Sequence, residues 1–144
     1  MFGNKEGLLE ALLVEGADRL YQRLDSVSDD LSERERLFEL GRAYRRSALA
    51  SPNMHQLIFS DLVPATERTR AAIGRTFTVL VDAVAACVSV GILRPQDPQQ
   101  LATLLWTNVH GYVTLELTRL MQVADRDALF EQSLDAVFRG LSAR

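Results

Sequence analysis

The sequence has 144 residues, of which 47% are hydrophobic and 24% charged, and its formal net charge is −3. A chain of this length forms one domain by default and buries roughly two-thirds of its unfolded surface, so its core needs no cross-links. One cysteine and two histidines exclude a disulfide framework and a cysteine–histidine metal cluster, and the acidic balance excludes a broad positive field for nucleic acid.

The targeting features are those of a cytoplasmic protein. The first residues lack the basic segment and apolar run of a signal peptide. The longest strongly apolar stretch, residues 77–90, contains Asp82 and is shorter than the roughly 20 residues that a membrane span requires. We therefore expect a soluble cytoplasmic protein, and no cofactor is expected. Cys87 stands among valines and is expected to be buried and unreactive.

Apolar residues recur every three or four positions, and no segment alternates for long like a half-buried strand. This pattern predicts an all-α fold, an antiparallel bundle of about six helices. Asn4 is the expected N-cap of a first helix that reaches about Val27. Ser32 and Glu35 form a capping-box pattern for a second helix, which ends at Ser51.

A short third helix is predicted near residues 54–59. It leads to Pro64, whose fixed φ suits the first turn of the next and longest helix. That helix is expected to reach about Val90, with Gly91 as its C-terminal cap.

Two further helices complete the prediction. Asp97 supplies an N-cap and the next residue a first-turn proline for a helix over residues 98–123. The last helix is expected to start near Asp125 or Asp127 and to end at the C-terminus.

The helix predicted over residues 98–123 has two faces when its residues are placed at 100° per step. One face carries large side chains, among them Trp106, His110 and Val113. A helix with so little polar surface must be covered on more than one side. About a quarter turn from the large face lies a strip of small side chains that would let another helix approach: Thr103, Thr107, Gly111, Thr114 and Thr118.

The last helix also carries an apolar stripe, and one compact subunit would have difficulty burying both surfaces. An exposed apolar patch of several hundred Å² usually marks an interface, so we expect a homodimer. The alternative is that both stripes are the ordinary core of a monomer. The predicted interface residues are Thr107, Gly111, Thr114 and Thr118 with Phe130, Leu134, Val137 and Leu141.

A ligand site is predicted beside the large face. Trp106 and His110 lie one turn apart, so they can line one wall, and His110 or Tyr44 would offer a hydrogen bond to a small apolar or amphipathic effector. Alternatively, His110 is a core histidine bonded to a carbonyl and Trp106 only fills space. The predicted ligand-binding residues are Tyr44, Met54, Ile58, Phe59, Ile73, Phe77, Leu80, Val84, Trp106, His110 and Val113.

Two phrases of the sequence resemble the tetracycline-repressor-like (TetR) family of regulators. Phe2, Lys5 and Leu8 match the last three places of Tyr-x-x-Phe-x-x-Lys-x-x-Leu, the junction between that family's DNA-binding and effector domains. Residues 104–117, Leu-Leu-Trp-Thr-Asn-Val-His-Gly-Tyr-Val-Thr-Leu-Glu-Leu, resemble the Trp and His-Gly signature of one subgroup. The two phrases stand in the family's order at either end of the chain.

The resemblance implies a function. Residues 1–144 would be the ligand-binding and dimerisation domain of a ligand-responsive transcriptional repressor, and residues 1–9 its junction to an N-terminal helix-turn-helix domain missing from this sequence. DNA would be bound only through that missing domain, against which Phe2, Lys5 and Leu8 would pack. The family's last two long helices commonly form an isologous four-helix interface, which agrees with the expected homodimer.

Two other classes of function remain open. An enzyme could use His110 as a base, but the residues three and four positions away on its helix include no carboxylate, and no nucleophile elbow or phosphate loop appears. The chain is therefore not expected to be an enzyme. A truncated dimerisation partner, or a helical adaptor that acts without DNA, is the other alternative.

Overall fold

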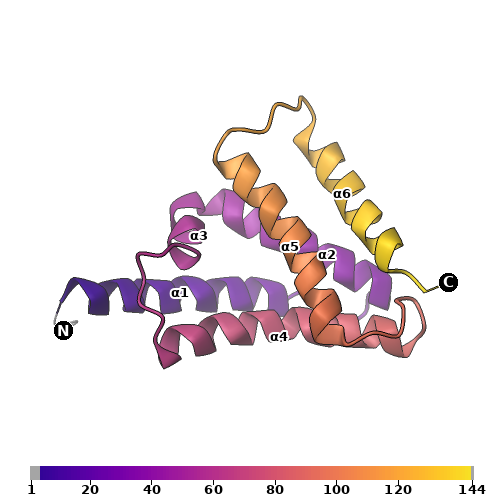
Figure 1. Cartoon of the computed structure of the whole chain (residues 1–144), viewed down its shortest axis with the longest axis horizontal. Helices are drawn as coiled ribbons and strands as arrows, with labels where there is room; N and C mark the ends of the chain where they lie inside the picture. The colour runs from indigo at the N-terminus through magenta and orange to yellow at the C-terminus, as the bar shows by residue number, and fades with distance from the viewer. Residues whose placement is uncertain (1–3, 144) are drawn as a thin grey trace.

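The chain folds into a bundle of helices. A computed structural model describes residues 4–143, and within this range it contains six helices and one isolated bridge, between Leu93 and Ser142 (Figure 1). The prediction of an all-α fold is confirmed. The helices are α1 (Lys5–Asp25), α2 (Glu33–Ala50), α3 (Pro52–Ile58), α4 (Glu67–Ser89), α5 (Pro98–Leu117) and α6 (Arg126–Leu141).

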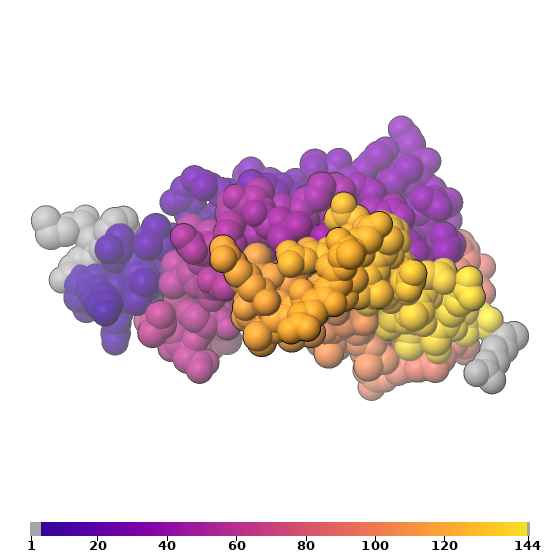
Figure 2. Space-filling model, turned by 90° about the horizontal axis from the view of Figure 1, so that it is seen from above, coloured from indigo at the N-terminus to yellow at the C-terminus, as the bar shows by residue number. Residues whose placement is uncertain are grey.

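The helices α1 and α4 lie side by side along the long axis of the molecule, and α2 packs against both (Figure 1). α5 crosses α4 and α2, and α6 lies beside α5. The short α3 packs against α1 and α2. Seen from above, α6 and the loop before it lie beside α2 on the surface (Figure 2). The start of α1 and the end of α6 are therefore at opposite ends of the molecule.

Side-chain caps confirm the predicted starts of α1, α2 and α6. Asn4 Oδ1 accepts a hydrogen bond from the N–H of Gly7 at 2.8 Å, and Ser32 Oγ accepts one from the N–H of Glu35 at 3.2 Å. Asp125 caps α6 in the same way. These bonds satisfy backbone donors that the first turn of a helix leaves free.

The start of α4 differs from the prediction, because Pro64 lies outside the helix. Thr66 is the N-cap, and it forms a reciprocal capping box with Thr69. The N–H of Thr69 donates to Thr66 Oγ1 at 3.2 Å, and the N–H of Thr66 donates to Thr69 Oγ1 at 2.9 Å. Two free backbone donors are thus satisfied at this position, which fixes the start of the helix at Glu67.

The end of α5 also differs from the prediction. The helix ends at Leu117, several residues before the expected Val123. Arg119 has a φ of 60°, in the left-handed region, which is incompatible with continuing a right-handed helix. The hydroxyl of Tyr112 donates to the carbonyl of Arg126 at 2.6 Å and so ties the start of α6 back to α5.

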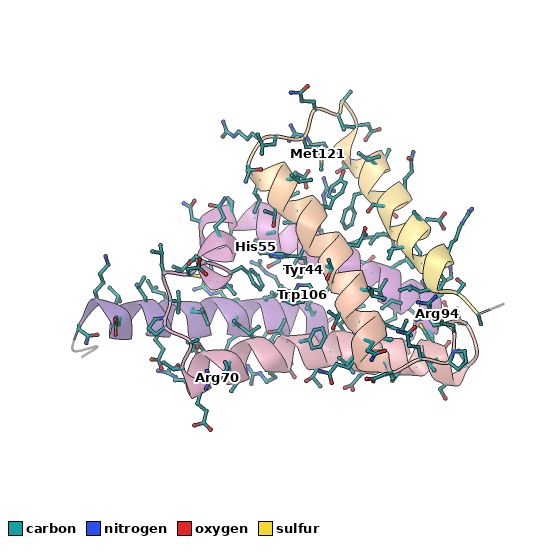
Figure 3. All side chains as sticks on the ribbon, in the orientation of Figure 1. Tyr44, His55, Arg70, Arg94, Trp106 and Met121 are labelled. Carbon is teal, nitrogen blue, oxygen red and sulfur yellow. The ribbon has the colours of Figure 1, made fainter. Side chains whose placement is uncertain are left out.

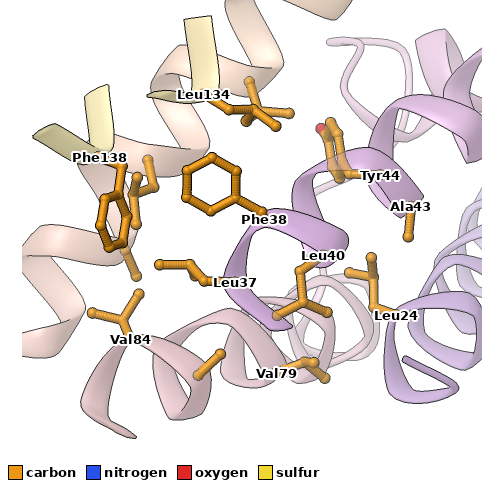
Figure 4. Packing of buried hydrophobic residues seen from close by; sticks show 14 of the residues in the cluster. Leu24, Leu37, Phe38, Leu40, Ala43, Tyr44, Val79, Val84, Leu134 and Phe138 are labelled. Atoms are coloured by element: carbon orange, nitrogen blue, oxygen red, sulfur yellow. The ribbon is translucent and has the colours of Figure 1, made fainter. Parts of the chain in front are cut away.

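The core consists of two hydrophobic clusters. The main cluster joins α1, α2, α4, α5 and α6, and Figure 4 shows part of it, including Leu37, Phe38, Val84 and Phe138. A smaller cluster lies between α1, α3 and α4 and consists of Leu13, Ala17, Ile58 and Ala72 with their partly buried neighbours. Helices α1 and α4 contribute to both clusters and contact each other directly.

Cys87 lies in the main cluster and is completely buried. Its Sγ donates to the carbonyl of Glu33 at 3.4 Å. Burial, with a further contribution from the charge of Glu33, raises the pKa of the Cys87 thiol to about 11. The thiol is therefore protonated at neutral pH and weakly nucleophilic.

Arginines of α2 hold the C-terminal helices. Arg45 donates to both carboxylate oxygens of Glu116 on α5, at 2.9 and 2.7 Å, and to Asp127 on α6 at 2.7 Å. The Glu116 side chain is only 4% exposed and that of Arg45 12%, so their charges are paired inside the protein. Arg42 forms a second two-bond contact with Glu131 of α6, nearer the solvent. Besides apolar packing, α6 is thus fixed in register by directional ion pairs.

One helix of the described range, α4, is long and apolar enough to cross a membrane, with a mean hydropathy of 1.6 over its most apolar window. This is weak support for a membrane span, because core helices of soluble proteins also meet this criterion. In the bundle, α4 packs against α1, α2 and α5, and 28% of its most apolar window is buried.

Candidate ligand-binding site

An apolar cavity of about 460 Å³ opens between α1, α3, α4 and α5, where the two clusters meet. Its volume falls in the range of about 300–1,000 Å³ that is typical of small-molecule sites. The lining residues are Ala17, Leu20, Leu24, Tyr44, Ile58, Phe59, Arg70, Ile73, Gly74, Thr76, Phe77, Leu80, Thr103 and Trp106.

The longest wall of the cavity is one face of α4. Arg70, Ile73, Phe77 and Leu80 follow one another at spacings of three and four residues and form one stripe, with Gly74 beside Ile73. The distance along the helix axis from the first to the last of them is about 15 Å. A Cβ added to Gly74 would meet no atom within 4 Å. The cavity is therefore elongated along α4, with open space beside its middle.

The mouth of the cavity is marked by lining residues that are exposed to solvent. These are Arg70, Gly74 and Thr103. Figure 3 shows Arg70 near the start of α4, whereas Tyr44 and Trp106 lie together farther along the molecule, where α5 crosses. Tyr44 is only 7% exposed. The cavity thus has a charged, open end and an aromatic, buried end.

Three aromatic rings form the buried end. The ring centroid of Trp106 lies 5.9 Å from that of Phe59, the residue that follows α3, and 5.9 Å from that of Phe77 on α4. Both ring pairs are tilted. Such tilted contacts are favourable because the edge of one ring faces the π-face of another. The rings give the cavity large flat surfaces suited to an apolar ligand.

A chain of hydrogen bonds lies behind these rings. Trp106 Nε1 donates to the hydroxyl of Tyr44 at 3.2 Å, and this hydroxyl lies 2.7 Å from His110 Nδ1. Burial lowers the pKa of His110, so its imidazole is neutral at neutral pH. With the imidazole proton on Nε2, Nδ1 accepts the proton of Tyr44; with the proton on Nδ1, the imidazole donates to the Tyr44 oxygen. Burial also raises the pKa of Tyr44, which keeps its hydroxyl protonated. The three side chains therefore satisfy one another.

His55 on α3 packs against the same group. It is 6% exposed, and its ring centroid lies 5.4 Å from that of Tyr44, 5.0 Å from Phe59 and 5.6 Å from His110. Its Nε2 is buried and has no hydrogen-bond partner among residues 4–143. Burial, and next the proximity of His110, lower the pKa of His55 to about 4. His55 was not among the residues predicted from the sequence, although a histidine on a short apolar helix is a signal for a buried polar group.

Seven of the predicted ligand-binding residues line the cavity. They come from four separate elements, which shows that the structure brings the predicted surfaces together. The seven are Tyr44, Ile58, Phe59, Ile73, Phe77, Leu80 and Trp106.

The other four predicted residues do not line the cavity. Val84 and Val113 are completely buried in the main cluster, because the cavity ends at Leu80, one turn before Val84, and at Trp106, about two turns before Val113. Met54 lies one turn before Ile58 on α3 and fills the space above Gly16 of α1, outside the lining. His110 lies behind the lining, where it packs against the rings of Phe59 and Trp106 and is hydrogen-bonded to the Tyr44 hydroxyl.

Half of the lining was not predicted. Arg70, Gly74 and Thr76 were not assigned, although Arg70 and Gly74 continue the predicted stripe of α4 toward its start. Thr103 had been placed only in the strip of small side chains. The contribution of α1, through Ala17, Leu20 and Leu24, requires knowing which helix faces α4, and periodicity alone does not provide this.

The predicted dimer residues fall into two groups. Thr107, Gly111, Thr114 and Thr118 are exposed and form one stripe on the outer face of α5. The stripe continues through Leu104 and Leu115, which are 44% and 50% exposed. A Cβ at Gly111 would meet no atom within 4 Å in the protomer. This face is free to contact another chain.

Phe130, Leu134 and Leu141 of α6 require a correction. They are 2%, 6% and 6% exposed in the single chain, so they belong to the core of the protomer and are buried without a partner. Val137 is half-buried at the edge of this core. The outer face of α6 instead presents Gln132, Ala136 and Gly140.

The predicted junction residues lie at the start of α1. Lys5 is exposed in the first turn, and Leu8 is 44% exposed. Phe2 lies outside the described residues. The structure thus leaves the side chain of Leu8 accessible for packing.

Comparison with known structures supports the fold. The chain superimposes on a protein of unknown function from Rhodococcus sp. RHA1 with a TM-score of 0.88 and 24% identity, covering 97% of this chain and 74% of the other. It superimposes on SCO4313, which is described as a regulatory protein, with a TM-score of 0.75 and 24% identity, covering 93% and 73% of the two chains. A search of curated proteins finds no match.

The family comparison covers most of the chain. Residues 37–137 match the family described as "Tetracyclin repressor-like, C-terminal domain". The match includes Tyr44, the cavity face of α4, Trp106 and the outer face of α5. The chain therefore belongs to the family of tetracyclin repressor-like C-terminal domains.

Proposed function

We propose that this chain is the effector-binding and dimerisation domain of a ligand-responsive TetR-like transcriptional repressor, acting in the cytoplasm and without catalytic activity. The cavity of about 460 Å³ is the observation that carries the proposal. It combines an apolar lining, an opening to solvent and a volume suited to a small molecule. Residues 1–144 act as one domain in this proposal.

The position of the cavity suggests how a ligand acts. One wall is α1, which contributes Ala17, Leu20 and Leu24 and also contacts α4 directly, since Thr76 Oγ1 lies 3.4 Å from the carbonyl oxygen of Ala17. A ligand that fills the cavity favours the arrangement of α1 and α4 that leaves room for it, which shifts the population of conformations. In the proposal, the start of α1 transmits this shift to a helix-turn-helix domain that binds DNA, with Lys5 and Leu8 at the contact.

The outer face of α5 supports the dimer. Small side chains at Thr107, Gly111 and Thr114 allow a second helix to approach closely, and Leu104 and Leu115 supply apolar area at the two sides. We propose an isologous interface in which this face packs on its copy in a second chain, flanked by the outer face of α6. Sedimentation velocity should give a dimer at micromolar concentration, and a strict monomer would contradict this part of the proposal.

Ligand binding can be tested before the natural effector is known. Phenylnaphthylamine, a neutral apolar dye, should bind with an increase in its fluorescence and saturate at one site per chain. Trp106 is the only tryptophan of the sequence and lines the cavity, so its emission should change in parallel.

A variant that fills the cavity provides the decisive control. Gly74→Leu places a side chain into the open space and should abolish dye binding. Thr78→Leu adds the same bulk at an exposed position outside the lining and should leave binding intact. Equal binding by the parent and Gly74→Leu would refute the proposed site.

A further inference from the structure

The cavity offers its ligand very few hydrogen-bond donors. The indole N–H of Trp106 is donated to the Tyr44 oxygen, and the Tyr44 hydroxyl is hydrogen-bonded to His110 Nδ1. Thr76 Oγ1 donates to the carbonyl of Ala72 at 3.3 Å. With the His110 proton on Nε2, the Tyr44 proton is used in its bond to Nδ1, and both hydroxyls then only accept. A carbonyl or carboxylate oxygen of a ligand would therefore find no free donor at the buried end, which penalises placing such a group there.

The Thr103 hydroxyl at the mouth is used in the same way, because it donates to the carbonyl of Gln99 at 2.8 Å. Among the described residues that line the cavity, Arg70 is thus the one that offers free donors, and it is also the one that is charged. Its Nη1 donates to the carbonyl of Ala65 at 2.8 Å, which anchors the guanidinium and leaves its other N–H groups available.

The neighbouring arginines of α4 are engaged differently. Arg68 pairs with Glu10 at 3.7 Å, and Arg75 pairs with Asp18 at 2.6 Å. No carboxylate within the described part of the chain lies within ion-pair distance of Arg70. The charge at the mouth is therefore not neutralised by an ion-pair partner in the way that the flanking charges are.

From these observations we infer that the ligand is an elongated amphipathic anion, an organic acid whose apolar body lies along α4 and whose carboxylate binds Arg70. This inference rests on the proposed function and specifies its ligand class. The apolar part of the wall extends from Ile73 to Leu80 and accommodates a chain or fused rings. The acidic group stays at the open end, where it keeps part of its hydration while it accepts charge-assisted hydrogen bonds from the guanidinium.

Two dyes that differ in one group test the inference. Anilinonaphthalene sulfonate carries an anion on the same arylamine skeleton that phenylnaphthylamine carries without charge. Binding of each is measured by fluorescence titration to the parent, Arg70→Met, Arg70→Lys and Arg68→Met. The last variant is the matched control, since it removes a positive charge two residues away that does not line the cavity.

Arg70→Met should weaken binding of the sulfonate about tenfold, which corresponds to about 1.4 kcal/mol. It should leave the neutral dye unchanged, because Met keeps the apolar stem of the side chain. Arg70→Lys should retain most of the preference for the anion, and Arg68→Met all of it. Raising the ionic strength should weaken the sulfonate selectively, because the mouth is exposed. Decanoate should displace the neutral dye from the parent at lower concentrations than decanol, and this difference should disappear in Arg70→Met.

The outcomes separate this inference from the proposed function. If Arg70→Met weakens both dyes equally or neither, while Gly74→Leu abolishes both, then the cavity binds ligands but Arg70 does not recognise an anion, and the inference is overturned. A larger effect of Arg68→Met than of Arg70→Met would also overturn it. If Gly74→Leu changes neither dye, the proposed function itself fails.

Discussion

Acidification should destabilise the bundle through His55, whose imidazole is buried beside Tyr44, Phe59 and His110. Burial lowers the pKa of His55 to about 4, whereas an unfolded chain has a histidine pKa of about 6.5. Between these values the unfolded state binds more protons than the folded state, so the free energy of unfolding falls as the pH falls. The contribution of His55 is fully present above pH 6.5 and decreases by about 2–3 kcal/mol between pH 7.5 and pH 4.5.

Urea unfolding monitored by circular dichroism at several pH values between 4.5 and 7.5 measures this loss. His55→Gln removes the titrating group and should flatten the pH dependence by about 2–3 kcal/mol relative to the parent, whatever its own stability at neutral pH. The carboxylates that titrate near pH 4 are the same in both proteins, so the difference between the two curves isolates His55. Parallel curves would show that His55 is not held neutral in the folded state, and would refute the reasoning.

Four further substitutions have defined expectations. Gly111→Arg should convert the proposed dimer to a monomer in sedimentation velocity with unchanged helicity, because the position is open in the protomer; a persistent dimer would place the interface elsewhere. Glu116→Gln should lower the free energy of unfolding in urea by about 2–3 kcal/mol, since it leaves the buried Arg45 less fully paired, whereas Glu131→Gln in the more exposed pair should cost about 0–1 kcal/mol. Gly74→Ala should raise the free energy of unfolding by about 0.5–1 kcal/mol through helix propensity alone, and a decrease would mean that the space beside it is filled.

Periodicity and capping residues were sufficient to predict the fold class and most of the helix starts. Asn4, Ser32 and Asp125 each accept a bond from the first turn of their helix, as residues of this type do. The end of α5 could not be predicted in this way. Apolar residues continue after Leu117, so periodicity does not mark this end. Arg119 adopts a left-handed conformation, which at the end of a helix is usually found at a glycine or an asparagine.

The candidate site was predicted only in part, because some of its residues are brought together by the packing of helices against one another. The stripe through Phe77 and Leu80 and the face of Trp106 are properties of single helices, so they can be read from spacing. The participation of α1 and the role of Arg70 depend on how helices face one another. The burial of Phe130 also follows from tertiary packing, because Arg45 and its carboxylate partners orient α6 and turn that ring inward.

The burial of Cys87 makes the reactivity of its thiol a measure of local opening between α2 and α4. The sulfur has no contact with solvent, and its high pKa leaves little thiolate even when neighbouring residues fluctuate. A maleimide or disulfide reagent can therefore react only after α2 and α4 have separated around it. The rate of labelling at a chosen pH then gives the free energy of that separation directly, in the same manner as amide hydrogen exchange but at one defined atom.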